Sequence, residues 1–228
     1  MIEYIPNRRL RHMVRRHLKY ARVPQRYRQL LDLVAEMAPR HIVEIGVYTG
    51  RRSVEMIEAA ALTRPASEIS YDGFDLFDLM EETILAEELS KQPDDIEVVR
   101  QKIERTGASV RLHRGWSNDT LPVVAKAHPC SADIAFIDGG HALETIRQDW
   151  ENIQPMLTNK SAVVFDDYYI DRPDLTDRFG CNMLIDNLDD TLWNVRRLPI
   201  IDRFMKPDGL FNVALVEVRR RIPSANPA

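Results

Sequence analysis

Cysteine, glycine and long hydrophobic runs are all scarce in this chain. Its only two cysteines, Cys130 and Cys181, are too few and too far apart to suggest a disulfide framework or a zinc site. No apolar run approaches the roughly 20 residues that a membrane-spanning helix needs, and the arginine-rich N-terminus lacks the apolar core of a signal peptide. We therefore expect a cytoplasmic protein that has no membrane partner and whose chemistry depends on oxygen and nitrogen ligands.

The composition is typical of a single folded domain. The 228 residues include 9 glycines, 44% are hydrophobic and 29% are charged, which excludes a collagen-like or disordered chain. A chain of this length buries most of its apolar surface in one core. We predict an N-terminal helical appendage at residues 1–38, a main domain at residues 39–222 and a tail at residues 223–228.

The N-terminal segment is strongly basic although the whole chain has a net charge of -4. Residues 1–40 contain ten lysines and arginines against three acidic residues. Apolar residues recur at helical spacing on both sides of Pro24, which predicts two amphipathic helices. A basic face is compatible with nucleic acid, but no RNA- or DNA-reading motif accompanies the arginines. We favour a contact within a homo-oligomer, or a cover over the active site, for these helices.

From residue 41 the pattern changes to short apolar runs that alternate with helical stretches. Helices are expected at 51–62, 79–106 and 142–154, which implies right-handed crossovers and a mostly parallel sheet. Two later runs without a helix between them predict a C-terminal antiparallel hairpin, with strands at 193–203 and 211–219. The parallel strands are expected at 41–46, 69–74, 110–113, 133–137 and 162–165.

The strand ends carry the residues that matter for ligand binding, because ligands of such sheets bind beyond the carboxyl ends of the strands. After the first strand, Gly46 and Gly50 allow a tight turn, but their spacing differs from the G-x-G-x-x-G pattern that binds a pyrophosphate. The second strand ends at Asp75, whose carboxylate suits the two hydroxyls of a ribose. A nucleoside without a phosphate fits these two strands best.

Five motifs follow one another at the ends of the expected strands. They are E-x-G-x-x-x-G at 44–50, G-F-D-L-F-D at 73–78, L-H-R-G-W-S at 112–117, F-I-D-G-G-H at 136–141 and V-F-D-D-Y at 164–168. The ordered set resembles that of class I S-adenosylmethionine (SAM)-dependent methyltransferases, which implies a Rossmann-like sheet and a SAM site across residues 41–170. The last two motifs look especially like a branch of small-molecule O-methyltransferases that includes metal-dependent sugar enzymes of natural-product (macrolide) biosynthesis. The cofactor-binding residues that the resemblance implies are Glu44, Gly46, Tyr48, Thr49, Gly50, Ser53, Asp75, Gly115, Trp116, Ser117 and Asp138.

Three carboxylates, Asp138, Asp166 and Asp167, follow the fourth and fifth strands, which lie beside the first strand in the methyltransferase topology. Carboxylates crowded into one cleft repel each other unless they are protonated or bridged by a cation, which predicts Mg²⁺ or Mn²⁺. We expect His141 to be the catalytic base and Asp138 to assist it. Adjacent residues of a regular strand point to opposite faces, so one of Asp166 and Asp167 is alternatively structural. His141 is alternatively a helix cap, and Asp138 alternatively contacts SAM.

The resulting hypothesis is a SAM-dependent transferase that methylates a hydroxyl of a small metabolite with the help of a divalent metal. One alternative is a metal-independent N- or O-methyltransferase. Another is a non-catalytic SAM-binding protein with a regulatory or nucleic-acid-associated role. We expect acceptor specificity to reside in residues 76–109, in residues 168–182 and in the N-terminal helices.

Overall fold

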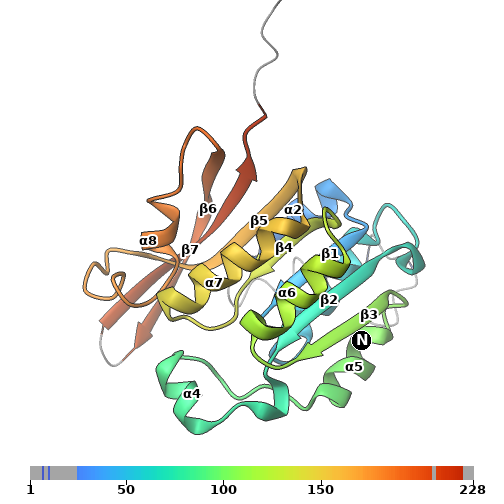
Figure 1. Cartoon of the computed structure of the whole chain (residues 1–228), viewed down its shortest axis with the longest axis horizontal. Coiled ribbons are helices and arrows are strands. Elements are labelled where there is room, and N and C mark those ends of the chain that lie inside the picture. The colour runs from blue at the N-terminus through green and yellow to red at the C-terminus, as the bar shows by residue number, and fades with distance from the viewer. Residues whose placement is uncertain (1–6, 8–9, 11–24, 207–208, 223–228) are drawn as a thin grey trace, which may run out of the picture.

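A seven-stranded mixed sheet forms the centre of the computed structural model, which describes residues 7, 10, 25–206 and 209–222 (Figure 1). The strand order is β3-β2-β1-β4-β5-β7-β6, with β1 to β5 parallel and the β6–β7 hairpin antiparallel. This order confirms the predicted fold class and places β1, β4 and β5 side by side. The strands are β1 (His41–Ile45), β2 (Ser70–Asp75), β3 (Ser109–Arg114), β4 (Ala132–Ile137), β5 (Leu157–Ile170), β6 (Trp193–Lys206) and β7 (Gly209–Arg220).

Helices cover both faces of the sheet. In Figure 1, α6 and α7 lie in front of the sheet and α2 lies behind it. The α-helices are α2 (Tyr27–Met37), α3 (Arg51–Ala60), α4 (Glu82–Glu87), α5 (Ile96–Glu104), α6 (Ser117–Ala127), α7 (Leu143–Ile153) and α8 (Asn182–Ile185). Short 3-10 turns are η2 (Ala66–Glu68), η3 (Phe77–Leu79) and η4 (Gln154–Met156).

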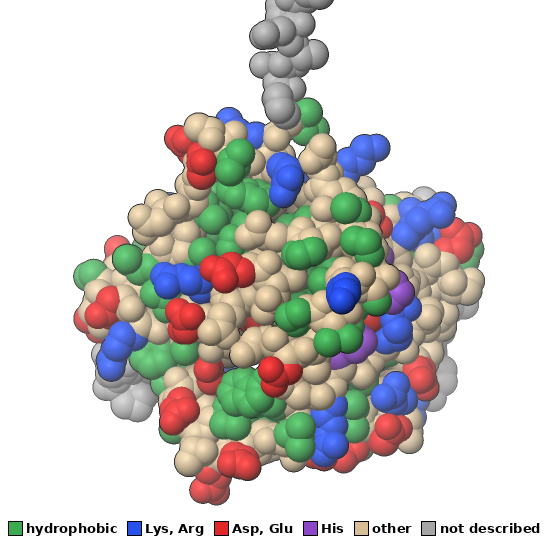
Figure 2. Space-filling model, viewed as in Figure 1, with side chains coloured by type: hydrophobic (Ala, Val, Ile, Leu, Met, Phe, Trp, Pro, Cys, Tyr) green, Lys and Arg blue, Asp and Glu red, His purple; other side chains and the backbone are tan. Residues whose placement is uncertain are grey.

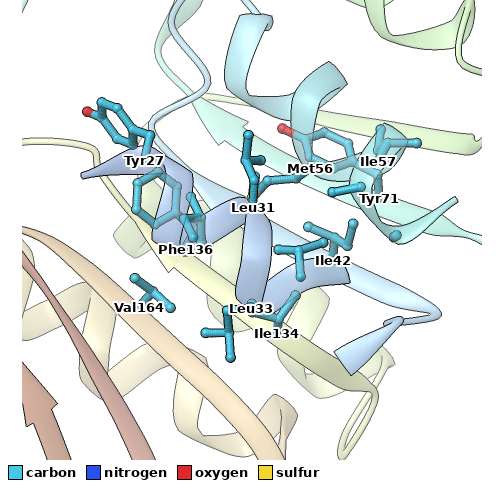
Figure 3. Close-up of a cluster of buried hydrophobic side chains, with 14 of the residues drawn as sticks. Tyr27, Leu31, Leu33, Ile42, Met56, Ile57, Tyr71, Ile134, Phe136 and Val164 are labelled. Atoms are coloured by element: carbon cyan, nitrogen blue, oxygen red, sulfur yellow. The ribbon is translucent and has the colours of Figure 1, made fainter. Parts of the chain in front are cut away.

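Each central strand contributes side chains to two apolar cores, because successive residues of a strand point to opposite faces. On β1, Ile42 packs into the core under α2, α3 and α5, whereas Val43 packs into the core under α6 and α7. Figure 3 shows the first of these cores, which includes Leu31 of α2, Met56 of α3 and Phe136 of β4. Burial on both faces explains why these strands are continuous apolar runs in the sequence.

The second predicted N-terminal helix is confirmed as α2, whereas the first one lies outside the described residues. Leu30 and Val34 of α2 are completely buried in the same core as the sheet residues. The described part of the predicted appendage is therefore packed into the main core. Among the described residues, no helix is long and apolar enough to cross a membrane.

The predicted helix at 79–106 is wrong in its extent, because α4 and α5 are separate. Leu89 has a left-handed φ of 49°, and Pro93 follows. Asp95 is then the N-cap of α5, where its side chain accepts a hydrogen bond from the backbone N–H of Glu97. Helix α6 was not predicted, and it has Pro122 inside it. Its buried residues Leu121, Val124 and Ala125 follow helical spacing and were the available signal.

Candidate active site

A cavity of about 690 Å³ opens at the carboxyl ends of β1, β2, β4 and β5. This volume lies within the roughly 300–1,000 Å³ range of small-molecule sites. Residues of the β1–α3 loop, of the segment after β2 and of the start of α6 line one part of it. Residues of α2, β5 and the β6–β7 hairpin line another part. The predicted site residues on its wall are Gly46, Tyr48, Thr49, Asp75, Gly115, Trp116, Ser117, Asp138, His141, Asp166 and Asp167.

Gly46 allows the β1–α3 loop to pass directly over the end of β4. Its φ is 92°, and a Cβ atom at this position would lie 2.1 Å from the backbone oxygen of Asp138. The backbone N–H of Asp138 donates to the oxygen of Ile45 at 2.8 Å, which holds the two strand ends together. A side chain at position 46 is excluded on both steric and conformational grounds.

Asp75 links the first loop to the second strand end. Its Oδ2 accepts a hydrogen bond from the backbone N–H of Tyr48 at 2.7 Å, and its Oδ1 accepts one from the N–H of Phe77 at 3.1 Å. Burial raises the pKa of Asp75, and these backbone donors oppose the rise. Asp75 is also on the cavity wall, so its carboxylate borders the space in which a ligand would bind. Trp116 is 41% exposed, so its ring is part of the cavity surface and is not buried in the core.

Glu44 and Ser53 lie behind the glycine loop, and neither lines the cavity. The Ser53 hydroxyl and the Tyr71 hydroxyl both donate to Glu44 Oε2, each at 2.5 Å. Burial raises the pKa of Glu44 to about 7, although these two hydrogen bonds lower it. Glu44 and Ser53 thus support the loop from behind, and their contact with the cofactor stays a prediction. Gly50 likewise lies off the cavity wall, where its φ of 69° starts α3.

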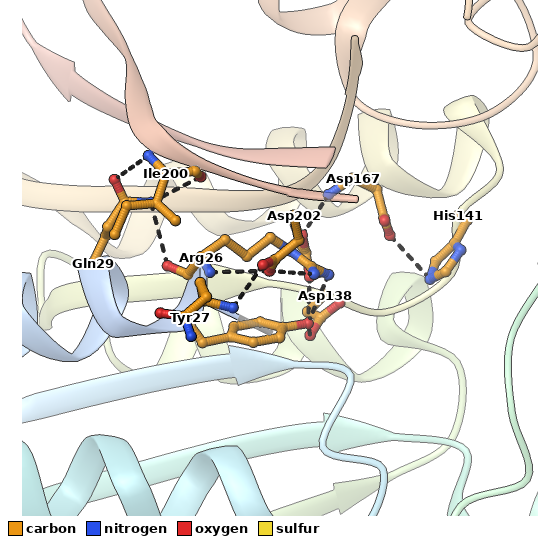
Figure 4. A network of polar contacts seen from close by, with 10 residues as sticks. Arg26, Tyr27, Gln29, Asp138, His141, Asp167, Ile200 and Asp202 are labelled. Atoms are coloured by element: carbon orange, nitrogen blue, oxygen red, sulfur yellow. Dashed lines mark hydrogen bonds and ion pairs between the residues drawn. The ribbon is translucent and has the colours of Figure 1, made fainter. Parts of the chain in front are cut away.

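Three of the predicted residues converge at one point of the cavity. Asp138, His141 and Asp167 each offer one ligand atom, and these atoms lie within 4.8 Å of one another. His141 Nε2 lies 3.0 Å from Asp167 Oδ2 (Figure 4). Burial raises the pKa of Asp138 well above its usual range, and the charges of Asp166 and Asp167 add to the rise. A cation would relieve this crowding of negative charge, so the donor set fits Mg²⁺ or Mn²⁺.

Asp166 lies outside this group, although the sequence analysis predicted it as a metal ligand. The strand register shifts between Phe165 and Tyr168, and Asp167 has a left-handed φ of 58°. This bend lets Asp167 face His141, as Figure 4 shows, while Asp166 binds the guanidinium of Arg26. Burial by itself would raise the pKa of Asp166, but Arg26 and Tyr27 outweigh burial and hold it at about 2.

Several cavity residues were not among the predicted site residues. Arg26 and Tyr27 come from the start of α2, and Phe204 and Phe211 come from the C-terminal hairpin. The side chain of Arg52 stacks on the Tyr27 ring, with its Cζ 3.5 Å from the ring centroid. No sequence motif marks these residues, because only the sheet order brings them to the strand ends. The predicted specificity segments do reach the cavity, through Met80 and Glu88 among others in 76–109 and through Tyr169 in 168–182.

The fold and the site define a methyltransferase of the Rossmann-like type, and comparison with known proteins agrees. A family model described as a methyltransferase domain matches residues 43–168, more than half of the chain. The chain therefore belongs to this family and is a class I SAM-dependent methyltransferase. No curated protein sequence matches it.

Solved structures of low sequence identity share the fold. The O-methyltransferase TomG from Streptomyces achromogenes, solved with SAM, is 15% identical with a TM-score of 0.57, covering 90% of this chain and 86% of its own. A TDP-rhamnose 3'-O-methyltransferase of calicheamicin biosynthesis is 21% identical with a TM-score of 0.57. The match covers 91% of this chain and 85% of that enzyme. A putative rRNA methylase from Clostridium thermocellum is 12% identical with a TM-score of 0.58, covering 87% and 99%.

Proposed function

We propose that this enzyme transfers the SAM methyl group to a hydroxyl of a small metabolite, with a divalent cation held by Asp138 and Asp167 and with His141 as the base. The observation that carries the proposal is the convergence of these three side chains beside the glycine loop. Hard cations prefer oxygen ligands, and Mg²⁺ commonly uses one or two protein carboxylates. We therefore assign the two carboxylates to the cation and leave the imidazole for proton transfer.

His141 has the hydrogen-bonding pattern of a base. Its Nε2 faces the cluster and lies 3.0 Å from Asp167 Oδ2, whereas its Nδ1 is buried and has no hydrogen-bond partner among the described residues. We assign the proton of the acceptor hydroxyl to the imidazole of His141, and Asp167 orients the ring and stabilises the imidazolium that results. The acceptor oxygen then bonds to the methyl carbon as the carbon–sulfur bond breaks, which releases S-adenosylhomocysteine.

The remaining residues bind and orient the two substrates. Asp75 and the glycine loop hold SAM, and this positioning supplies much of the rate enhancement. When bound, the cation would lower the pKa of the acceptor hydroxyl and orient a second acceptor oxygen. Phe204 and Phe211 form an apolar wall for the rest of the acceptor. Two structurally similar enzymes named in connection with tomaymycin and calicheamicin synthesis support a natural-product acceptor.

The nucleic-acid alternative has less support. The similarity to a putative rRNA methylase is at 12% identity and concerns the fold. Acidic and basic side chains are interspersed on the face shown in Figure 2, whereas binding of a phosphate backbone favours clustered basic residues.

A metal-independent mechanism is favoured by one observation. Arg26 neutralises Asp166, which removes one of the three negative charges that a metal ion would otherwise balance.

Chelation tests the metal-assisted proposal. We expect EDTA to suppress S-adenosylhomocysteine formation with catechol or TDP-rhamnose as the acceptor, and Mn²⁺ to restore it. Asp167→Asn should weaken Mn²⁺ binding by roughly 10- to 100-fold. His141→Gln should lower kcat by roughly 100- to 10,000-fold and leave Mn²⁺ affinity unchanged.

A matched control is Asp171→Asn, which changes an exposed aspartate off the cavity wall. This variant should retain both Mn²⁺ affinity and activity. Full activity of the wild-type enzyme in excess EDTA would reject the metal and favour the metal-independent alternative.

A further inference from the structure

Arg26 makes an unusually complete set of contacts for a side chain that is only 6% exposed. Its Nε donates to Asp166 Oδ1 and its terminal NH2 group donates to Asp166 Oδ2, both at 2.7 Å, a bidentate pairing. A second carboxylate holds it from the neighbouring hairpin. Asp202 Oδ2 accepts from the Arg26 side chain at 3.2 Å and from the Arg26 backbone N–H at 3.0 Å. Arg26 is therefore fixed between β5 and β6.

These contacts use the whole acceptor capacity of Asp166. A carboxylate has about four lone-pair positions, two on each oxygen. On Oδ1 they accept from Arg26 and from the backbone N–H of Asp167, the latter at 2.8 Å. On Oδ2 they accept from Arg26 and from the Tyr27 hydroxyl, the latter at 2.5 Å. No position on Asp166 is left for a metal ion while Arg26 is in place.

We propose that Arg26 is an internal cation that withholds Asp166 from the divalent metal ion, so that two carboxylates rather than three set the metal affinity of this enzyme. This inference rests on the proposed function, because it concerns the same cation. It makes Arg26 a positioning residue that acts through Asp166. The consequence is a weaker metal site than the sequence pattern of three aspartates indicates.

Removal of the Arg26 charge tests the proposal through Mn²⁺ binding, measured by electron paramagnetic resonance without SAM or acceptor. Arg26→Gln frees Asp166 and removes a positive charge close to the site, so we expect Mn²⁺ affinity to rise by at least about tenfold. Arg26→Lys keeps the charge but loses the bidentate geometry, and its affinity should lie between those of the wild type and Arg26→Gln. A residue with only a structural role would show the opposite effect, because a loosened site binds the metal more weakly.

Arg28→Gln is the matched control. Arg28 lies on the same helix, hydrogen-bonds to the Gln25 side chain at 3.0 Å and does not line the cavity. This variant makes the same chemical change and should leave Mn²⁺ affinity unchanged. Circular dichroism and thermal melting of each variant establish that it is folded.

A double variant separates loss of charge from loss of a ligand. Arg26→Gln with Asp166→Asn removes one charge of each sign, so the net charge of the site is unchanged. We expect its Mn²⁺ affinity to stay within about threefold of the wild type, whereas Asp167→Asn loses roughly 10- to 100-fold. If the double variant loses as much affinity as Asp167→Asn, then Asp166 is a ligand in the wild type and the inference is wrong.

The outcomes also distinguish this inference from the proposed function. If the wild type binds Mn²⁺ and Arg26→Gln binds it no more tightly, the role of Arg26 is overturned and the metal-assisted function stands. If Arg26→Gln binds Mn²⁺ and the wild type does not, the role of Arg26 is supported and metal assistance in the wild type is overturned. Absence of binding in every folded variant overturns both.

Discussion

Asp75 is the residue that we predict to bind the ribose of SAM. It accepts backbone hydrogen bonds from Tyr48 and Phe77 and lines the cavity, so it both shapes the β1–α3 loop and faces the cavity. We predict that Asp75→Ala weakens SAM binding by about 1.5–3 kcal/mol, the contribution of a hydrogen bond to a charged group. Isothermal titration calorimetry with SAM and S-adenosylhomocysteine measures this directly.

Asp78→Ala provides the comparison for Asp75→Ala. Asp78 lies three residues further along, pairs with Arg114 at the surface and is off the cavity wall. Its removal should leave SAM affinity unchanged, because surface ion pairs contribute little. Equal affinities of the Asp75→Ala variant and the wild type would remove Asp75 from the ribose site.

At the scale of the element, α2 is the helix that joins the core to the site. It belongs to the predicted N-terminal appendage, its buried face is part of the main core, and its first turn supplies Tyr27 to the cavity. A helix in this position connects packing of the core with the geometry of the site. Deletion of residues 1–38 would therefore remove core residues as well as the basic segment.

Truncation of Leu30 tests the packing of α2. Leu30 is completely buried, and we predict that Leu30→Ala lowers the free energy of unfolding by about 2–5 kcal/mol through lost burial and the cavity that remains. Glu36→Ala, on the exposed side of the same helix, should change it by less than about 0.5 kcal/mol. Urea unfolding monitored by circular dichroism measures both. A loss below about 1 kcal/mol for Leu30→Ala would show that α2 is peripheral.

At the scale of the whole molecule, buried carboxylates give stability an unusual dependence on pH. Burial raises the pKa of Glu44 to about 7. Burial, and to a smaller extent the charge of Glu88, raises the pKa of Asp149 to about 7 as well. In the unfolded chain these groups ionise near pH 4, so between about pH 4 and 7 the folded state binds more protons. Stability therefore falls as pH rises through this window and levels off above pH 7.

Two other aspartates act in the opposite direction at low pH. Burial opposes ionisation of Asp72, but hydrogen bonds from Arg111, His113 and His41 hold the pKa of Asp72 well below its usual range. Arg26 similarly holds the pKa of Asp166 at about 2. These depressed pKa values stabilise the fold above about pH 4, and this stabilisation is lost as pH falls toward 2. We therefore expect maximal stability near pH 4 to 5.

Glu44→Gln tests the part of this pH dependence that is due to Glu44. The free energy of unfolding of the wild type should fall between pH 5 and pH 8 as Glu44 ionises. The neutral amide cannot ionise, so the free energy of unfolding of the variant should fall by about 2–3 kcal/mol less over the same range. Glu87→Gln, at an exposed position on α4, should follow the wild-type curve. Urea unfolding at both pH values gives the comparison. Parallel curves for Glu44→Gln and the wild type would show that Glu44 is ionised in the folded protein at pH 5.

The sequence by itself determined the order of the strands, the glycine loop and the strand-end placement of Asp75, Asp138 and Asp167. These features are local, because apolar runs, glycines and acidic strand ends are visible within short windows of the chain. The helix break at Pro93 is also local, and a closer reading of its turn residues would have found it.

Only the tertiary structure decided how the charged residues of the site pair. Arg26 and Asp166 are 140 positions apart, and they meet because α2 packs beneath β4 and β5 while β6 supplies Asp202 beside them. The opposite orientations of Asp166 and Asp167 depend on a bend in β5 where its pairing with β7 shifts register. No local pattern encodes such partners, because they are set by the packing of segments far apart in the sequence.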